Sequence, residues 1–183
     1  MKKQEILSLI GDSITTLRTF ITPISDAEKD VFLKHAVTSV SVSDDLAAVF
    51  KEKCWAETLD DSSLTFTIRL KSTHEYIGYF QLKRINDSPE IGIDIVEAFQ
   101  KKGYGYEVCQ NIIDYLFQNT TIRVLQYNCF RCNIPSISLA EKLGAVRVGE
   151  RVLLEYLKDK DVSEQTKKES SDFDLIIYEI RKI

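Results

Sequence analysis

The segment with the clearest chemical potential is the basic, glycine-containing stretch Gln100-Lys101-Lys102-Gly103-Tyr104-Gly105. It follows an alternating apolar run from Ile91 to Val96 and precedes an amphipathic run from Tyr106 to Gln118. A strand, a tight turn and a helix start in this order present backbone N–H groups and the positive end of a helix dipole to an anion. Glycine lets the backbone approach a phosphate closely because it carries no side chain. The pattern therefore predicts a phosphate-bearing ligand.

Three phosphate-binding motifs compete for this turn. A dinucleotide fingerprint needs a third glycine at position 108, which is Val108. A nucleotide P-loop needs four residues between its glycines and then Gly-Lys-Ser/Thr, which the turn lacks. The pattern that remains is Gln/Arg-x-x-Gly-x-Gly/Ala, matched at Gln100, Gly103 and Gly105.

Composition limits the class of protein. A chain of 183 residues with 44% hydrophobic and 28% charged residues is typical of one globular domain, predicted to span residues 1–183. A net charge of -4 argues against non-specific nucleic-acid binding. We find neither a secretory leader nor the roughly 20 apolar residues of a membrane span, so we expect a cytoplasmic protein.

Cysteine and histidine residues give no metal site. Cys129-x-x-Cys132 has the spacing of half a zinc site or a redox pair, but a zinc ribbon needs a second pair, and a redox motif opens a helix, whereas this one lies at the end of a predicted strand. We interpret the cysteines as reduced packing thiols. His35 is predicted on a helix and His74 in a hairpin loop, and neither is assigned a metal or base role.

The predicted elements position the turn inside an α+β domain. Hydrophobic periodicity, caps and turn residues define them. The strands are predicted at 6–10, 14–21, 64–70, 76–82, 90–96, 124–130, 146–154 and 172–180. The helices are predicted at 27–37, 44–56, 106–118 and 135–143, with a long polar loop at 158–171. Three strands from 64 to 96 form an antiparallel meander that leads into the turn.

Downstream motifs make the chain resemble the GNAT acetyltransferase superfamily, and more narrowly its RimJ/RimL-type members. The similarity includes Asn133-Ile134-Pro135-Ser136 and the segment from Ser138 to Ala145, together with Glu90 to Ile95 before the turn. Gly149 to Arg151 and Asp174 to Tyr178 are similar to the closing strands of the family. The resemblance implies a mixed, mostly antiparallel central sheet flanked by helices, with two splayed strands forming an acetyl-CoA groove.

The resemblance also implies where acetyl-CoA, the acetyl donor, would bind. The pyrophosphate would lie on the amides from Lys101 to Tyr106, and Lys101 and Lys102 would add positive charge. The pantetheine arm would run along strand residues 93–95, and Asn133 would bond to it or to the thioester. The implied cofactor-binding residues are Ile93, Asp94, Ile95, Gln100, Lys101, Lys102, Gly103, Tyr104, Gly105, Tyr106 and Asn133. No metal is implied.

The resemblance implies direct attack of an amine on the thioester. Glu90 is the candidate general base, although a solvated carboxylate at a strand end is an equal alternative. Ser136 is the candidate acid for the leaving thiolate, and its alternative role is a hydroxyl that satisfies a free N–H at a helix start. Many family members carry a tyrosine where this chain has Ala140. The thiolate of coenzyme A is also a fair leaving group unaided.

The acceptor has several alternatives. The resemblance suggests a ribosomal-protein N-terminal amine, while a small-molecule amine or polyamine fits the same chemistry. Ala140 motivates a non-catalytic acyl-CoA-binding module of the same fold, and the net charge speaks against an RNA-facing factor. We expect no nucleic-acid or membrane partner, and a homodimer is compatible with the sequence.

Overall fold

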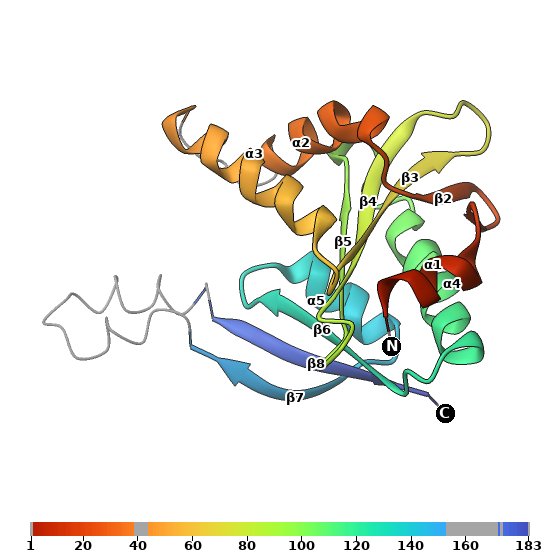
Figure 1. The fold of residues 1–183 in the computed structure, drawn as a ribbon. Helices are drawn as coiled ribbons and strands as arrows, with labels where there is room; N and C mark the ends of the chain where they lie inside the picture. The colour runs from red at the N-terminus through yellow and green to blue at the C-terminus, as the bar shows by residue number, and fades with distance from the viewer. Residues whose placement is uncertain (1, 39–43, 153–171, 173, 183) are drawn as a thin grey trace, which may run out of the picture. The chain divides into compact units, whose positions relative to one another are not determined.

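The computed structural model describes residues 2–38, 44–152, 172 and 174–182 (Figure 1). Its contacts divide the chain into two compact units, Met1–Ile122 and Arg123–Ile183. Each unit combines helices with antiparallel strands, so the α+β class predicted from the sequence is confirmed. The single domain and the splayed strands both concern the relation between the two units, and they stay predictions.

The first unit contains a sheet in the order β1-β2-β3-β4-β5, whose neighbours pair antiparallel. Its strands are β1 (Ile14–Thr15), β2 (Thr19–Pro23), β3 (Leu64–Leu70), β4 (Tyr76–Lys83) and β5 (Glu90–Ile95). Its helices are α1 (Lys3–Ile10), α2 (Lys29–Thr38), α3 (Asp44–Leu59) and α4 (Tyr104–Asn119), with short 3-10 helices η1 (Asp26–Glu28) and η2 (Glu97–Phe99). The meander that leads into the glycine turn is confirmed.

The two faces of this sheet differ in chemistry. Directly opposed residues of neighbouring strands share a face, so the register assigns each side chain to one side. The face that α4 contacts is apolar, with Ile21, Phe66, Ile68, Phe80, Leu82, Ile91 and Ile95 all buried. The face that α2 and α3 contact carries Thr65, Thr67, Tyr79, Gln81 and Asp94. Figure 1 shows these helices around the strands of the unit.

A β-bulge interrupts the pairing of β3 with β4. Ile68 opposes Gly78 and Arg69 opposes Tyr76, so β4 carries one extra residue at this point. A bulge changes the alternation of side chains along its strand. Gly78 then lies so close to β5 that an added Cβ would be 2.2 Å from the carbonyl oxygen of Asp94. Only glycine fits there without moving one of the strands.

The N-terminal prediction was wrong. Residues 6–10 were expected to form a strand of a hairpin, but Lys3–Ile10 is the helix α1. Ile6 and Ile10 are its buried residues, which is the i, i+4 spacing of a helix face. The side chain of Glu5 accepts a hydrogen bond from the backbone N–H of Lys2 at 2.9 Å and satisfies one helix-start donor. Five residues were too few to separate a helical from a strand period.

The second unit is a smaller antiparallel sheet with one helix. It contains β6 (Val124–Phe130), α5 (Ile134–Lys142), β7 (Val146–Arg151) and β8 (Leu175–Arg181), with strand order β6-β8-β7. Each of these elements was predicted within a few residues. The predicted loop at 158–171 and residues 153–154 of the predicted strand lie outside the described residues.

The cysteines occupy different environments. Cys109 on α4 is fully buried, and burial raises the pKa of its thiol far above the ordinary value. Cys129 is buried and Cys132 is exposed, and all four cysteines are free thiols. Within the described part of the chain, no three His, Cys, Asp or Glu side chains are grouped so as to hold a metal ion. The same part has no helix of the length and apolarity that a bilayer crossing requires.

Candidate active site

The glycine turn connects β5 to α4 through two residues with left-handed backbone. Lys101 has a φ of 59° and Gly103, the N-cap of α4, has a φ of 84°. A lysine in this region is uncommon, which indicates that the surroundings fix the turn. Gln100 contributes by donating from Nε2 to the carbonyl oxygen of Ile95 at 2.8 Å, which ties the turn back to the strand.

The start of α4 has no side-chain cap. No side chain accepts a hydrogen bond at its N-cap, in contrast to the usual pattern at helix starts. The backbone N–H groups of a first helical turn have no partner within the helix and attract negative charge. The predicted residues Gly103, Tyr104, Gly105 and Tyr106 form this start. The positive end of the helix dipole lies at these residues, where an anion is favoured.

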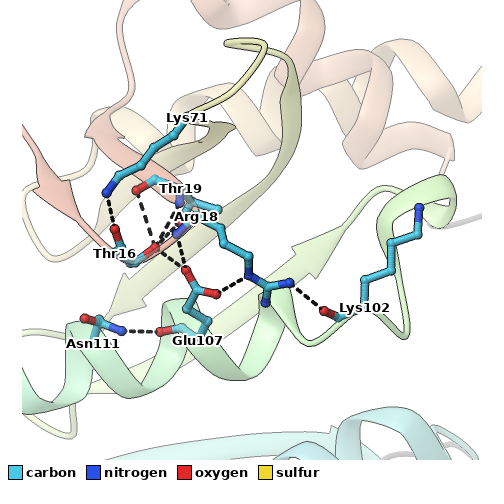
Figure 2. Close-up of polar contacts among 7 residues, drawn as sticks. All are labelled: Thr16, Arg18, Thr19, Lys71, Lys102, Glu107 and Asn111. Atoms are coloured by element: carbon cyan, nitrogen blue, oxygen red, sulfur yellow. Dashed lines mark hydrogen bonds and ion pairs between the residues drawn. The ribbon is translucent and has the colours of Figure 1, made fainter.

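Three contacts brace the turn from the side of β1 and β2, as Figure 2 shows. Glu107 accepts hydrogen bonds from the Thr16 hydroxyl at 2.5 Å and from the backbone N–H of Arg18 at 2.7 Å. The Arg18 Nε forms an ion pair with the Glu107 Oε2 at 2.6 Å. Burial of Glu107 opposes ionisation, but the hydrogen bonds from Thr16 and Arg18 outweigh it and lower the pKa of the carboxyl. Glu107 is therefore an ionised carboxylate whose negative charge is balanced by the Arg18 guanidinium.

The guanidinium of Arg18 also contacts the turn itself. Its Nη1 donates to the carbonyl oxygen of Lys102 at 3.0 Å, and its Cζ lies 4.2 Å from the centre of the Tyr104 ring. An added Cβ on Gly103 would lie 3.4 Å from the Arg18 Nη2. Neither Arg18 nor Glu107 was predicted from the sequence. A first-turn glutamate and an arginine in a strand connection were the only signals available.

Lys101 and Lys102 were both expected to add positive charge at the glycine turn, but the side chain of Lys102 is directed to η2. Lys102 turns its ammonium back to η2, where it donates to the carbonyl oxygen of Ala98 at 2.8 Å and lies 5.4 Å from the centre of the Phe99 ring. Lys101 is exposed.

The predicted residues of β5 divide between its two faces. The side chain of Ile95 is buried on the apolar face, which Ile93 shares, whereas Glu90 and Asp94 belong to the face that α2 and α3 contact. Glu90 forms an ion pair with Arg84 at 2.5 Å, with 22% of its side chain exposed. Asp94 instead faces His35. The predicted base is thus already paired with a cation.

In the second unit, Asn133 and Ser136 lie together at the start of α5. Asn133 is the N-cap and its Oδ1 accepts from the backbone N–H of Ser136 at 3.1 Å. The Ser136 hydroxyl lies 2.8 Å from the Tyr127 hydroxyl, and the side chain that caps the helix is that of Asn133. Tyr127 is buried on β6 and was not singled out from the sequence. Strand alternation was its only signal.

Comparisons with known proteins give one consistent result. Residues 18–146 match the family model described as an acetyltransferase (GNAT) domain. An uncharacterized N-acetyltransferase of Bacillus licheniformis, p20, is 30% identical over 106 residues. That alignment covers 56% of this chain and 58% of the relative, so the chain spans under two thirds of the relative's length.

Solved structures with the same fold have low sequence identity. The ribosomal-protein-S5-alanine acetyltransferase of Vibrio fischeri has a TM-score of 0.69 and 15% identity, covering 93% of this chain and 97% of its own. A chimera of the spermidine N-acetyltransferase SpeG of Vibrio cholerae with hSSAT has a TM-score of 0.68 and 16% identity, covering 89% and 95%. RimJ of Mycobacterium smegmatis, in complex with CoA-disulfide, has a TM-score of 0.68 and 13% identity, covering 93% and 87%.

Proposed function

The chain belongs to the GNAT acetyltransferase family, and we propose that it transfers the acetyl group of acetyl-CoA to a primary amine. The observation that carries this proposal is the uncapped start of α4, where Lys101 and Gly103 adopt left-handed backbone and Arg18 braces the turn. A helix start that is held rigidly and left without a side-chain acceptor is suited to a phosphate group.

The pyrophosphate of acetyl-CoA would accept hydrogen bonds from amides between Lys101 and Tyr106. The pantetheine arm would follow the backbone of residues 93–95. Asn133 uses its Oδ1 within α5, which leaves the two N–H donors of its amide as the atoms that would contact the donor.

In the proposed reaction, a neutral amine attacks the thioester carbonyl. The C–N bond forms, the C–S bond breaks, and the thiolate leaves with the electron pair of that bond. Ser136, supported by its contact with Tyr127, would protonate the thiolate. The amine proton would go to a carboxylate on the α2 side of β5, where the candidates are Glu90 and Asp94.

The acceptor class follows from the same chemistry. Structural neighbours include enzymes described for a ribosomal-protein alanine and for spermidine, and both acceptors present a primary amine. Carboxylates on β5 and a net charge of -4 favour an acceptor with positive charge. We therefore propose a protein N-terminus or a polyamine, and we retain a non-catalytic acyl-CoA-binding module as the alternative because of Ala140.

Two measurements test the proposal. Titration calorimetry with coenzyme A should show binding, and release of its thiol from acetyl-CoA should rise when spermidine or peptides beginning with Ala or Ser are added. Mass spectrometry should show a single acetyl group on the amine. Binding of coenzyme A with no acetylation across this panel would favour the non-catalytic module. Absence of coenzyme A binding would overturn both alternatives.

A further inference from the structure

His35 on α2 was given no functional role from the sequence. It lies among polar side chains on the face of the first unit's sheet that α2 contacts. The Nδ1 of His35 is 3.1 Å from the Tyr76 hydroxyl, and its Nε2 is 3.5 Å from the Oδ1 of Asp94. Its ring meets the rings of Tyr76 and Tyr79 edge-on, with centroids 5.7 and 5.4 Å away. Only 9% of the His35 side chain is exposed. The imidazole is therefore fixed in place.

The bulge in β4 brings both tyrosines to this histidine. Tyr76 and Tyr79 are three residues apart, a spacing that would place them on opposite faces of a regular strand. Burial, followed by the negative charge of Asp94, raises the pKa of both phenols well above the ordinary value. Both hydroxyls therefore stay protonated. If the Tyr76 hydroxyl donates to Nδ1, then Nε2 is the ring nitrogen that carries the N–H on the side of Asp94.

Among His35, Tyr76, Tyr79 and Asp94, it is Asp94 that offers a solvent-exposed carboxylate. Its side chain is 25% exposed, whereas the side chain of His35 is buried. Two residues along the same face of β5, an added Cβ on Gly92 would meet no atom within 4 Å. The face of β5 that carries Asp94 therefore has open space at Gly92. Gly92 directly precedes residues 93–95, along which the pantetheine arm would run.

We propose that Asp94 is the general base for the acceptor amine and that His35 is its positioning residue. This inference rests on the proposed function and deepens it. After the amine nitrogen bonds to the carbonyl carbon, it carries a positive charge and an acidic proton. The Asp94 carboxylate takes that proton, the C–S bond breaks, and the thiolate leaves with the electron pair. Asp94 then returns its proton to water through its exposed side.

Glu90 is the natural comparison because it lies on the same face of the same strand. Its carboxylate pairs with Arg84 at 2.5 Å. A carboxylate oxygen that a guanidinium already contacts is less available to an incoming amine. The contact of the Asp94 carboxylate is instead with the His35 imidazole, at 3.5 Å. Its geometry therefore suits a base better.

The matched pair Asp94→Asn and Glu90→Gln tests the assignment. We expect Asp94→Asn to lower kcat about 100-fold with the most reactive amine of the panel, since general bases contribute on the order of 10²–10⁴-fold. The KM for acetyl-CoA and the affinity for coenzyme A should change less than about twofold. Glu90→Gln tests the rival carboxylate, and a larger loss of kcat in Glu90→Gln than in Asp94→Asn would make Glu90 the base and overturn the assignment. The control is Glu52→Gln, at an exposed residue of α3, which should leave kcat unchanged. Far-ultraviolet circular dichroism confirms that the variants fold.

The kinetic pattern separates a base from a binding group. Methoxyamine is weakly basic, so its nitrogen loses its proton readily after attack, and the loss in Asp94→Asn should be smaller with it. A raised KM for the amine with unchanged kcat would show that Asp94 only binds the acceptor, and would overturn the assignment. If the wild-type protein turns over and Asp94→Asn matches it, the base lies elsewhere while the proposed function stands. If the wild-type protein acetylates no amine, the proposed function fails first.

Variants of His35 test its positioning role. His35→Ala should lower kcat about tenfold with little change in the KM for acetyl-CoA. His35→Gln places an amide donor near the position of Nε2, so its kcat should be closer to that of the wild-type protein than the kcat of His35→Ala is. Equal kcat values for the two variants would show that His35 does not act through this donor. A wild-type kcat in His35→Ala would remove His35 from the proposal.

Discussion

The helices α4 and α5 begin in opposite ways. At α5, Asn133 caps the helix with its own side chain and Pro135 occupies the first turn. At α4, Gly103 provides no cap, and the only charge in the first turn, Glu107, is directed into hydrogen bonds with Thr16 and Arg18. The start of α5 thus has a side-chain cap, whereas the start of α4 has none. The difference supports the proposal that the start of α4 receives an anion.

The largest expected effect tests the uncapped start of α4. Gly103→Ala places a side chain at a φ of 84°, and we expect it to weaken coenzyme A binding at least about tenfold, measured by calorimetry. Gly144→Ala is the matched control because Gly144 has a φ of 75° and open space around it. Both variants carry a similar backbone strain. Equal coenzyme A affinity in the two variants would contradict the pyrophosphate assignment.

A smaller effect is expected from the brace behind that start. Glu107→Gln removes a carboxylate that accepts hydrogen bonds from Thr16 and Arg18, and it should lower the free energy of unfolding at pH 7 by about 2 kcal/mol. Glu52 is exposed on α3, and Glu52→Gln should change that free energy by less than about 0.5 kcal/mol. Urea unfolding gives both values.

The stabilisation by Glu107 should depend on pH. The pKa of Glu107 is lowered in the folded protein, so the unfolded chain binds its proton more tightly. The stabilisation is then fully present above the unfolded pKa of about 4.3 and is lost as the pH falls through the folded value. The difference between wild-type protein and Glu107→Gln should therefore shrink below about pH 4. A difference that stays constant from pH 7 to pH 3 would contradict this origin.

The smallest effect sharpens the role of the capped start of α5. Asn133→Ala removes the cap and should cost about 1 kcal/mol of stability. Asn133→Asp keeps an oxygen acceptor for the Ser136 N–H but loses the amide donors. If Asn133 also contacts the pantetheine, Asn133→Asp should keep its stability and lose coenzyme A affinity. Unchanged affinity in Asn133→Asp would restrict Asn133 to the cap.

Sequence patterns predicted the parts of this protein that depend on local order. The meander from β3 to β5, the turn and α4 follow from alternation, glycine positions and amphipathic spacing. The helix α1 was missed because five residues around Ile6 fit both periods. Contacts between distant segments left no local pattern. Arg18 meets Glu107 across 89 positions and His35 meets Tyr76 across 41, so neither partner could be found from spacing.

The buried thiol on α4 has a consequence for following the protein in solution. Cys109 is fully buried and its pKa is far above neutral, so a thiol reagent reaches a reactive thiolate only when α4 leaves its place. Cys132 is exposed and reacts without any opening. Cys109 should therefore be labelled slowly and Cys132 rapidly. Their labelling rates report how often the helix behind the glycine turn detaches, and how far a bound donor suppresses that opening.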